Sequence, residues 1–362
     1  MFVSHLSLKD FRSYENLELS LKAGQNIFIG ENGEGKTNII EALMYLALLS
    51  SHRISSDQPL IKLDSERAYI RAKIESDERT TLVELEINNG KANRAKVNQN
   101  PVRSQKELLG LVKSVCFSPE DLDLVRGDPS ERRSFLDQLL IQQSPRLAGV
   151  ISDYERALKQ RNSLLKSRAP ESSLRSWSEH LATFGGELIA GRIKLINQIE
   201  PLFQIAYKNL SAKKLAKLGY KSSIPAPSSE KEVNKELMLK VIEEVKSQEI
   251  ERGISLVGPH RDDLILNLGD HPVKGYASHG ESWSIALALR LASYQLFINE
   301  GAKPILILDD VFSELDEGRR EKLLEIADSA EQTFITVAVE NDLPKAIQGA
   351  RFKVEMGKVV IL

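Results

Sequence analysis

Short segments that alternate between apolar and polar residues recur near the start of the chain, and this period-two pattern is typical of β-strands. The pattern is clear at residues 17–21 and returns at 69–74, 82–87 and 95–97. Asn88-Asn89-Gly90 predicts a hairpin turn between the last two segments, because Asn and Gly tolerate the positive φ angles of tight turns. We therefore expect a strand-rich lobe, antiparallel in this part, around one apolar helix at 39–49.

A helical pattern begins after residue 117. Ser118-Pro119-Glu120-Asp121 predicts a helix start, with Ser as the cap, Pro in the first turn and Asp able to reach back to the cap amide. Helical periodicity extends over residues 130–248, and strand patterns return after Gly253. We therefore expect an α/β fold in which a helical arm, residues 121–250, is inserted between the two parts of one mixed-sheet lobe, residues 1–120 and 251–362.

Composition limits the possible partners and compartments. The 362 residues include 28% charged side chains but carry a net charge of only −2, so any surface for nucleic acid must be local. Cys116 is the single cysteine, which excludes an internal disulfide and suits a reducing compartment. The N-terminus lacks the basic flank and apolar block of a targeting segment, and the longest apolar run, residues 42–49, is too short to span a bilayer. We expect a cytoplasmic protein without a membrane segment.

A phosphate-binding pattern, G-x-x-x-x-G-K-[ST], lies between an apolar strand and the helix at 39–49; it reads Gly30-Glu31-Asn32-Gly33-Glu34-Gly35-Lys36-Thr37. The glycines let backbone N–H groups surround phosphates, and the helix N-terminus adds partial positive charge. Lys36 can reach the terminal phosphates, and Thr37 can offer its hydroxyl to Mg²⁺. The pattern predicts that Gly30 to Asn38 bind ATP. The alternative is a glycine turn that only caps a helix.

A short apolar run at residues 304–308 ends in Asp309 and Asp310, as expected of a central strand buried on both faces. Beside the P-loop, Asp309 would hold Mg²⁺ directly or through water. Asp310 would orient or deprotonate the water that attacks the γ-phosphate. Without the P-loop, the two carboxylates would fit equally well a strand end that turns into solvent.

Ser278-His279-Gly280-Glu281 follows an expected strand at 273–276 and begins an amphipathic helix at 282–298, whose N-terminus is a second place suited to phosphate. The tetrad resembles the signature motif of ATP-binding-cassette (ABC) ATPases, and Ser313-Glu314-Leu315-Asp316 resembles their D-loop. Alone, the tetrad also fits an ordinary helix cap. The order of all these motifs matches the ABC family.

The complete set of motifs resembles the RecF family of bacterial recombination mediators, which is related to the heads of SMC proteins but lacks their long coiled coil. The likeness covers nearly the whole chain. It is carried by residues 8–14 (LKDFRSY), 51–53 (SHR), 117–122 (FSPEDL), 132–137 (RRSFLD), 157–162 (ALKQRN) and 258–263 (GPHRDD).

The resemblance implies an ABC/SMC-head-like P-loop ATPase that dimerises on ATP and binds single-stranded, duplex and junction DNA. Members of the family act in repair, recombination and replication with the RecO and RecR proteins, and help to load RecA at gapped DNA. Catalytic roles would fall to Lys36, Ser278, Glu281, Asp309 and Asp310. Ser278 and Gly280 would contact ATP held by a second copy of the chain, and Thr37 and Asp309 would hold Mg²⁺.

Three positions depart from related patterns. Glu281 stands where the family commonly has Gln. The expected strand at 333–339 lacks the histidine that many ABC ATPases use to sense the γ-phosphate. The sensor therefore stays unassigned, with Thr336 as one candidate. Asp310 is shorter than the Glu usual in transporters, and we therefore expect slow hydrolysis and a persistent ATP state.

Two basic stretches without acidic residues are candidates for DNA contact, and the alternative for each is a solvated face. The stretch 90–106 contains Lys91, Arg94, Lys96, Arg103 and Lys106, and the stretch 207–221 contains Lys208, Lys213, Lys214, Lys217 and Lys221. In the segment 258–263 we favour an ion pair of Arg261 with an aspartate near the nucleotide lobe, or a contact of His260 with a neighbour, over a metal site.

Two other functions remain as alternatives. A P-loop kinase acting on a small molecule would lack the signature and the D-loop and would be indifferent to DNA. An ABC subunit that energises a membrane transporter fits poorly with the helical insertion, Asp310 and the missing histidine.

Overall fold

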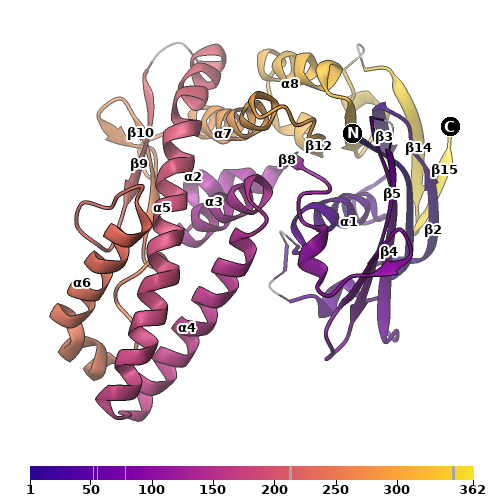
Figure 1. The fold of residues 1–362 in the computed structure, drawn as a ribbon. Helices are drawn as coiled ribbons and strands as arrows, with labels where there is room; N and C mark the ends of the chain where they lie inside the picture. The colour runs from indigo at the N-terminus through magenta and orange to yellow at the C-terminus, as the bar shows by residue number, and fades with distance from the viewer. Residues whose placement is uncertain (52, 55, 78, 212–213, 345–346) are drawn as a thin grey trace. The chain divides into compact units, whose positions relative to one another are not determined.

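The computed structural model describes every residue except 52, 55, 78, 212–213 and 345–346, so His52 and Lys213 of the motifs above lie outside the described residues (Figure 1). The described chain forms two compact units, Met1–Asp121 with Ser293–Leu362, and Leu122–Ala292. Residues 251–292, expected in the lobe made by the chain ends, belong instead to the second unit. The reason is strand pairing, because β10 (Asp263–Leu268) pairs antiparallel with β9 (Ala216–Lys221).

The first sheet of the first unit is a six-stranded antiparallel sheet in the order β2-β1-β4-β5-β6-β7. The expected strands and the hairpin turn after Asn88 are confirmed. In β4 and β5 the polar residues face outward and the apolar residues face the core, as alternation requires. The strands are β1 (Phe2–Phe11), β2 (Tyr14–Ser20), β4 (Arg67–Ser76), β5 (Arg79–Asn88), β6 (Arg94–Val97) and β7 (Asn100–Pro101).

The second sheet of this unit has the order β15-β14-β3-β13-β12-β8 and is parallel except for the edge strand β15. Its central strands are buried along their whole length, which explains their continuous apolar runs. Because they run parallel, the carboxyl ends of β3, β12 and β13 meet at one edge. The strands are β3 (Gly24–Ile29), β8 (Ser114–Phe117), β12 (Ile305–Asp309), β13 (Gln332–Val337), β14 (Gly349–Glu355) and β15 (Lys358–Ile361).

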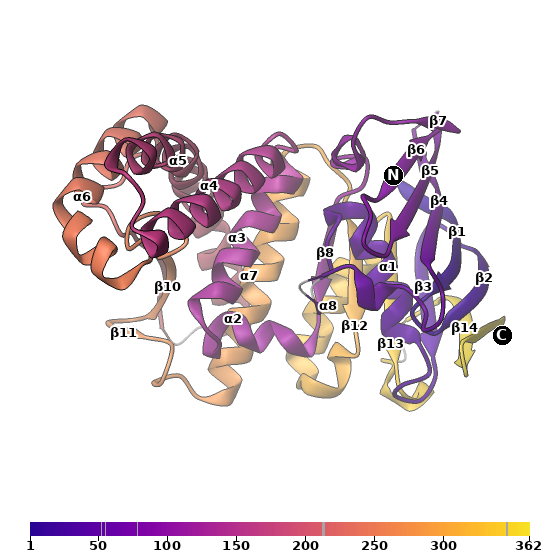
Figure 2. The same cartoon turned by 90° about the horizontal axis from the view of Figure 1, so that it is seen from below.

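Helix α1 (Lys36–Leu48) is buried along most of its length in a core that also contains side chains of both sheets (Figures 1 and 2). Phe28 of β3 stacks on Phe352 of β14, with ring centroids 4.9 Å apart. The P-loop that precedes α1 is therefore held on a rigid support. Helix α8 (Glu317–Ser329) and the short 3₁₀ turns η1 (Gln58–Leu60), η2 (Gln105–Leu108), η3 (Pro119–Asp121), η4 (Val311–Glu314) and η5 (Glu340–Asp342) complete this unit.

The second unit is a helical arm with a small three-stranded sheet, in the order β11-β10-β9 (Figure 2). The helix start at Ser118 is confirmed by the Asp121 carboxylate, which accepts the Ser118 amide at 3.2 Å. The elements of this unit are α2 (Leu122–Arg126), α3 (Pro129–Gln143), α4 (Leu147–Ser167), α5 (Glu171–Leu210), α6 (Lys231–Arg252) and β11 (His271–Pro272), with β9 and β10 as given above. Helix α7 (His279–Asn299) starts here and continues into the first unit.

The predicted strand at 273–276 is wrong. Only His271 and Pro272 pair with β10, and residues 274–276 form a turn in which Gly275 has a φ of +87°. That left-handed backbone ends the strand, and the pattern of apolar residues at 273 and 276 did not reveal it.

The segment 258–263 anchors the arm. Asp263 forms a bidentate ion pair with Arg132, at 2.8 and 2.9 Å. Arg261 donates to the Ser255 carbonyl at 2.9 Å, so the predicted pairing of Arg261 with an aspartate near the nucleotide lobe is wrong. The expected contact of His260 with a neighbour is present, because its Nδ1 lies 2.5 Å from the Tyr154 hydroxyl.

Candidate nucleotide-binding site

The P-loop follows β3, and glycine is required at two of its positions. A Cβ on Gly30 would lie 2.2 Å from the Val354 carbonyl oxygen, and a Cβ on Gly35 would lie 2.8 Å from the Tyr14 hydroxyl. Gly35 also has a φ of +114°, which L side chains rarely adopt. Any side chain at these two positions would push the loop away from β14 or from the turn before β2.

Lys36 is already oriented toward the loop that precedes it. Its ammonium donates to the carbonyls of Gly30 and Glu31 at 2.6 and 3.2 Å, and Asp310 Oδ2 lies 3.9 Å away. The side chain is only 3% exposed. A buried ammonium held by two carbonyls at a helix N-terminus is pre-positioned for an anion, because binding a phosphate adds the countercharge that the carbonyls lack.

The two carboxylates at the end of β12 share one buried threonine. Thr336 on the neighbouring strand β13 donates its hydroxyl to Asp309 Oδ1 at 2.6 Å, and its oxygen accepts the Asp310 amide at 2.9 Å. Thr336 is fully buried and committed to these two partners. Thr336 is one candidate for the γ-phosphate sensor, which the sequence leaves unassigned, and the next two residues, Val337 and Ala338, line the cavity.

Burial controls the charge of both carboxylates. It raises the pKa of Asp309 to about 6, against the opposing hydrogen bond from Thr336. Burial also raises the pKa of Asp310, although the nearby Lys36 ammonium lowers it. A divalent cation beside Asp309 and Asp310 would favour their charged forms, because it supplies the positive charge that the desolvated carboxylates lack.

These elements surround a cavity of about 400 Å³, within the size range of small-molecule sites. The P-loop contributes Lys36 and Thr37, and the end of β12 contributes Asp310. Sequence reasoning missed Pro119 and Asp342, which reach the cavity from distant segments. The lining residues are Asn32, Gly33, Lys36, Thr37, Pro119, Asp310, Phe312, Ser313, Glu314, Val337, Ala338 and Asp342.

The donor types fit a triphosphate with Mg²⁺. Thr37 offers a hydroxyl and Asp310 a carboxylate at the cavity wall, and Asp309 lies directly before Asp310 on β12. Mg²⁺ prefers oxygen ligands and usually takes one or two carboxylates together with substrate phosphates. The residues present are of the right kind for this ion.

Neighbouring segments brace the P-loop, and they explain the motif at 8–14. Arg12 forms a bidentate ion pair with the buried Glu41 of α1, with both distances 2.7 Å. The Tyr14 hydroxyl donates to the Gly35 carbonyl at 3.1 Å. The Glu34 carboxylate accepts the Met356 amide, and the Glu34 carbonyl accepts the Gly357 amide at 3.3 Å, so the β14–β15 turn supports the loop.

Ser278 and Glu281 lie in the second unit and cap α7 reciprocally. The Ser278 amide donates to Glu281 Oε2 at 2.9 Å, and the Glu281 amide donates to the Ser278 hydroxyl at 3.2 Å. Glu281 Oε1 also accepts the ammonium of Lys214 at 2.8 Å, and Lys214 together with Ser278 holds the pKa of this carboxyl at about 2. Ser278 is exposed, and Gly280 and Glu281 are half-buried.

The D-loop segment 313–316 leads from the carboxylates into α8. Ser313 donates to the Asp310 carbonyl at 3.0 Å, and Ser313 and Glu314 line the cavity. Asp316 caps α8 by accepting the Arg319 amide at 3.0 Å. Asp316 therefore has a structural role at the start of α8, independent of any role in joining two copies of the chain.

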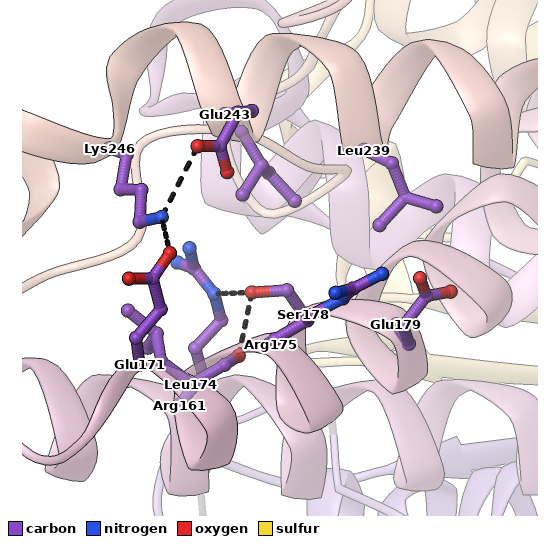
Figure 3. Close-up of a pocket in the computed structure, with 10 residues that line it drawn as sticks. Arg161, Glu171, Leu174, Arg175, Ser178, Glu179, Leu239, Glu243 and Lys246 are labelled. Carbon is purple, nitrogen blue, oxygen red and sulfur yellow. Dashed lines mark hydrogen bonds and ion pairs between the residues drawn. The ribbon is translucent and has the colours of Figure 1, made fainter.

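The arm contains a separate hollow of about 370 Å³ among α4, α5 and α6 (Figure 3). Some of its charged groups are paired with neighbouring side chains. Arg161 donates to Ser178 at 2.9 Å and to Glu249 at 2.6 Å, and Lys246 pairs with Glu171 and with Glu243, the latter at 3.2 Å. The hollow is lined by Arg161 of α4 and by charged side chains of α5 and α6.

Strand pairing gives the surroundings of the two basic stretches. On β6, Arg94 lies opposite Glu86 and Lys96 lies opposite Glu84 of β5. These two glutamates pair with Arg67 and Arg71 of β4, so they do not balance the first stretch. On β9, Lys217 and Lys221 are exposed on one side, while Ala216 and Leu218 are buried on the other. Lys217 lies opposite Asn267. Lys221 lies opposite Asp263, whose two oxygens are held by Arg132. We call the side that carries Lys217 and Lys221 the β9 face.

Within the described parts of the chain, no helix has the length and apolar character needed to cross a bilayer. Among the same residues, no group of three or more His, Cys, Asp or Glu side chains is arranged to hold a metal ion.

A P-loop beside a carboxylate-ended parallel strand, with a sheet of antiparallel strands and an inserted helical arm, defines a P-loop protein of the ABC/SMC-head class. Residues 2–358 match the family described as RecF/RecN/SMC N terminal domain. The chain belongs to the RecF family, as its motifs predicted. It is 52% identical to the DNA replication and repair protein RecF of Streptomyces avermitilis over 371 residues, which cover 99% of each chain.

Further relatives agree with this assignment. The chain is 49% identical to the protein of the same name from Kineococcus radiotolerans, with 96% of each chain covered. Its fold matches a solved structure of the recombination mediator RecF with ATP in the RecFOR pathway, with a TM-score of 0.91 and 28% identity, over 100% of this chain and 97% of that one. The Smc head of Pyrococcus furiosus matches at a TM-score of 0.56 and 17% identity over 100% and 96%, which supports the fold alone. The predicted fold class is confirmed.

Proposed function

We propose that this protein binds ATP with Mg²⁺ in the cavity of the first unit and hydrolyses it slowly. The observation that carries the proposal is the convergence of the buried Lys36 with Asp310 and Thr37 around one cavity. A RecF relative of the same fold has been solved with ATP, which supports the same ligand here.

Each site residue then has a distinct role. The P-loop amides and Lys36 hold the β- and γ-phosphates, and Thr37 with Asp309 holds Mg²⁺. Bound Mg²⁺ would neutralise the phosphate charge and polarise the γ-phosphate. Asp310 orients the attacking water. As a short carboxylate with its amide fixed by Thr336, it has limited reach, which agrees with slow turnover.

We further propose that ATP joins two copies of the chain head to tail. The capping box leaves Ser278 exposed at the start of α7, where a helix N-terminus can receive phosphate. Ser278 and Gly280 of one copy would then contact the ATP bound by the P-loop of the other. Glu281 would keep that helix start in shape.

The biological role that fits this chemistry is an ATP-dependent DNA-binding mediator of repair, recombination and replication. Acting with the RecO and RecR proteins, it would help to load RecA on gapped DNA. Curated relatives carry the name DNA replication and repair protein RecF, and the name RecFOR pathway accompanies a solved relative. Both support the proposal.

A DNA contact is assigned to the β9 face, and the basic stretch on β6 is a second candidate. Lys217 and Lys221 project from the β9 face, and the carboxylate of Asp263 opposite Lys221 is held by Arg132. Lysines on such a face can replace counterions along a phosphate backbone, and no element of base recognition is required.

The test uses light scattering with and without ATP, together with ATP binding and DNA binding at two salt concentrations. Lys36→Ala should abolish ATP binding. Ser278→Arg should retain ATP binding but prevent dimers, because the large side chain blocks the helix N-terminus. Dimerisation of Ser278→Arg at the level of the unchanged protein would count against the head-to-tail arrangement, and salt-insensitive DNA binding would count against the phosphate contact.

A further inference from the structure

Asp342 places a carboxylate on the wall of the P-loop cavity. It is the last residue of η5 and lines the cavity together with Asp310. Its amide donates to the Val339 carbonyl at 3.1 Å, and its side chain is half-buried. The turn therefore fixes the backbone from which this carboxylate reaches the cavity.

The Asp342 carboxylate lacks a protein partner within the described residues. No hydrogen bond or ion pair among them involves its oxygens. By contrast, Thr336 donates to Asp309, and Arg351 pairs with Glu340 of the same turn as Asp342. A half-buried charge without a partner is costly unless a ligand or water supplies the missing hydrogen bonds. The carboxylate is therefore free to act on the contents of the cavity.

The charges of Asp342 and Asp310 interact. Burial is the main cause that raises the pKa of Asp310, and the negative charge of Asp342 raises it further. Among the described residues that line the cavity, Lys36 is the only cation. The contents of the cavity therefore meet two carboxylates that lie within electrostatic reach of each other.

The chemistry of a carboxylate limits what Asp342 can bind. It cannot donate a hydrogen bond to a phosphate oxygen, because both groups only accept. It can accept a proton of a water molecule. A water that donates one proton to Asp310 has a second proton to place, and a second acceptor fixes the direction of its lone pair. This direction matters in phosphoryl transfer, since catalysis there consists mostly of positioning and electrostatic stabilisation.

We propose that Asp342 is a second acceptor for the attacking water: Asp310 and Asp342 each accept one of its protons, which turns the lone pair of the water toward the γ-phosphorus. This inference rests on the proposed function, in which ATP fills the cavity and Asp310 orients the water. It assigns a residue that neither the P-loop nor the end of β12 supplies.

The hydrolytic step then balances. The water oxygen forms a bond to the γ-phosphorus while the bond from that phosphorus to the bridging oxygen breaks, and ADP keeps the electron pair. One water proton stays on the new phosphate. The other passes to a carboxylate and from there to solvent.

The negative charge of Asp342 also opposes ATP. It repels the phosphates that Lys36 attracts, so the carboxylate weakens ATP binding while it speeds hydrolysis. Loss of this carboxylate therefore changes the two quantities in opposite directions, with tighter binding and slower turnover. A substitution that only disturbs the fold lowers both.

Asp342→Leu and Asp342→Asn separate the acceptor from the charge, because both remove the charge and only leucine also removes the acceptor oxygen. Affinity is measured with a non-hydrolysable ATP analogue and Mg²⁺, and turnover is measured at saturating ATP. In both variants the Kd of the analogue should fall about two- to ten-fold. Turnover of Asp342→Leu should fall about 10- to 100-fold, less than the loss of a group that itself transfers the proton. Asp342→Asn should keep more of the turnover than Asp342→Leu.

Glu340→Gln is the matched control. Glu340 belongs to the same turn and its substitution also removes a negative charge, but Glu340 pairs with Arg351 and is not among the described residues that line the cavity. This variant should leave both ATP affinity and turnover unchanged. Light scattering with ATP shows whether each variant still dimerises at the protein concentration used.

Three results would overturn this inference alone. The first is an Asp342→Leu variant that turns over ATP as fast as the unchanged protein. The second is a fall of ATP affinity together with turnover, which would make Asp342 a structural residue. The third is a loss of dimers in Asp342→Leu, which would assign its slow turnover to assembly. An unchanged protein that fails to bind or hydrolyse ATP would overturn the proposed function as well, so the failures are distinguishable.

Discussion

The hydroxyl of Thr336 donates to Asp309 Oδ1 at 2.6 Å, across the pair of parallel strands β12 and β13. The same oxygen accepts the Asp310 amide. One threonine therefore fixes the carboxylate proposed to hold Mg²⁺ and the backbone of the residue proposed to orient water.

Thr336→Val is expected to lower ATP turnover about 10- to 100-fold, the range measured for partners that orient metal ligands. The valine leaves Asp309 without its buried hydrogen bond, so Mg²⁺ affinity should fall with turnover. Turnover should be measured across a Mg²⁺ titration. Thr333→Val is the control, because Thr333 is also buried on β13 but donates to the Ala327 carbonyl at 3.1 Å. An equal loss of ATP turnover in both variants would mean that Thr336 affects turnover only by stabilising the fold.

Asp309 predicts a dependence of stability on pH in the absence of Mg²⁺. Burial raises its pKa to about 6 in the folded chain, whereas an unfolded Asp titrates near 3.8. Between these values the unfolded chain releases a proton that the folded chain retains. The contribution of Asp309 to the free energy of unfolding is therefore fully present below the unfolded pKa. It is lost as pH rises to about 6, and the loss is at most about 3 kcal/mol.

Asp309→Asn removes this titration. The variant should match the unchanged protein near pH 4 and be more stable than it at pH 7. Hydrogen exchange of β12 and β13, followed at both pH values, measures the difference in the first unit. A variant no more stable than the unchanged protein at pH 7 would contradict the raised pKa.

The local parts of the site were predictable from the sequence because they depend on short-range chemistry. The glycines of the P-loop, the apolar run before Asp309 and the Asn-Gly turn each specify a backbone conformation by themselves. What could not be predicted depends on pairing between distant segments. Thr336 became a partner of Asp309 only through the register of β13 with β12, and Pro119 reached the cavity from the end of another strand.

The same reason explains what the sequence could not show. Residues 90–106 contain no acid, but Arg94 and Lys96 lie opposite Glu86 and Glu84 of β5, which pair with Arg67 and Arg71 of β4. A stretch of sequence shows its own charges and not those of the neighbouring strand. Likewise β10 was expected with the first unit, because its pattern identifies a strand but not its partner β9.

Gly30→Ala tests the support behind the P-loop. The added Cβ would lie 2.2 Å from the Val354 carbonyl oxygen, a backbone atom that cannot move without shifting β14. We expect ATP affinity to fall at least about ten-fold and thermal stability to fall measurably. Gly90→Ala is the control. It has a φ of +68° but no atom within 4 Å of the added Cβ, so it should cost about 1 kcal/mol and leave ATP affinity unchanged. Full ATP affinity in Gly30→Ala would exclude a tight fit against β14.

Arg192→Met tests the buried ionic anchor of the arm. Arg192 donates to both oxygens of Asp137 at 2.9 and 2.8 Å and to the Pro259 carbonyl at 2.7 Å. Breaking a buried pair on one side typically costs about 3–5 kcal/mol, since the remaining charge has no partner.

Arg156→Met is the control, because it breaks an exposed pair with Asp153 and should cost at most about 1 kcal/mol. Urea unfolding followed by tryptophan fluorescence suits both, because Trp177 and Trp283 lie in the second unit. Similar midpoints for the two variants would argue against Arg192 as an anchor.

His260 predicts a pH response of the arm opposite to that of Asp309. Burial lowers its pKa to about 4, below the value of 6.5 for an exposed histidine. The folded arm therefore holds a neutral imidazole, and the unfolded chain takes up the proton first as pH falls. The contribution of the neutral His260 to the free energy of unfolding is present above pH 6.5. It is lost as pH falls toward 4, and the loss is at most about 3 kcal/mol.

His260→Gln should remove this loss, and tryptophan fluorescence between pH 4 and 7 should detect the difference. The nearby Tyr154→Phe keeps the histidine but removes its hydroxyl partner, so the acid-induced loss should persist in that variant. An acid response of the same size in His260→Gln would assign the titration to another group of the second unit.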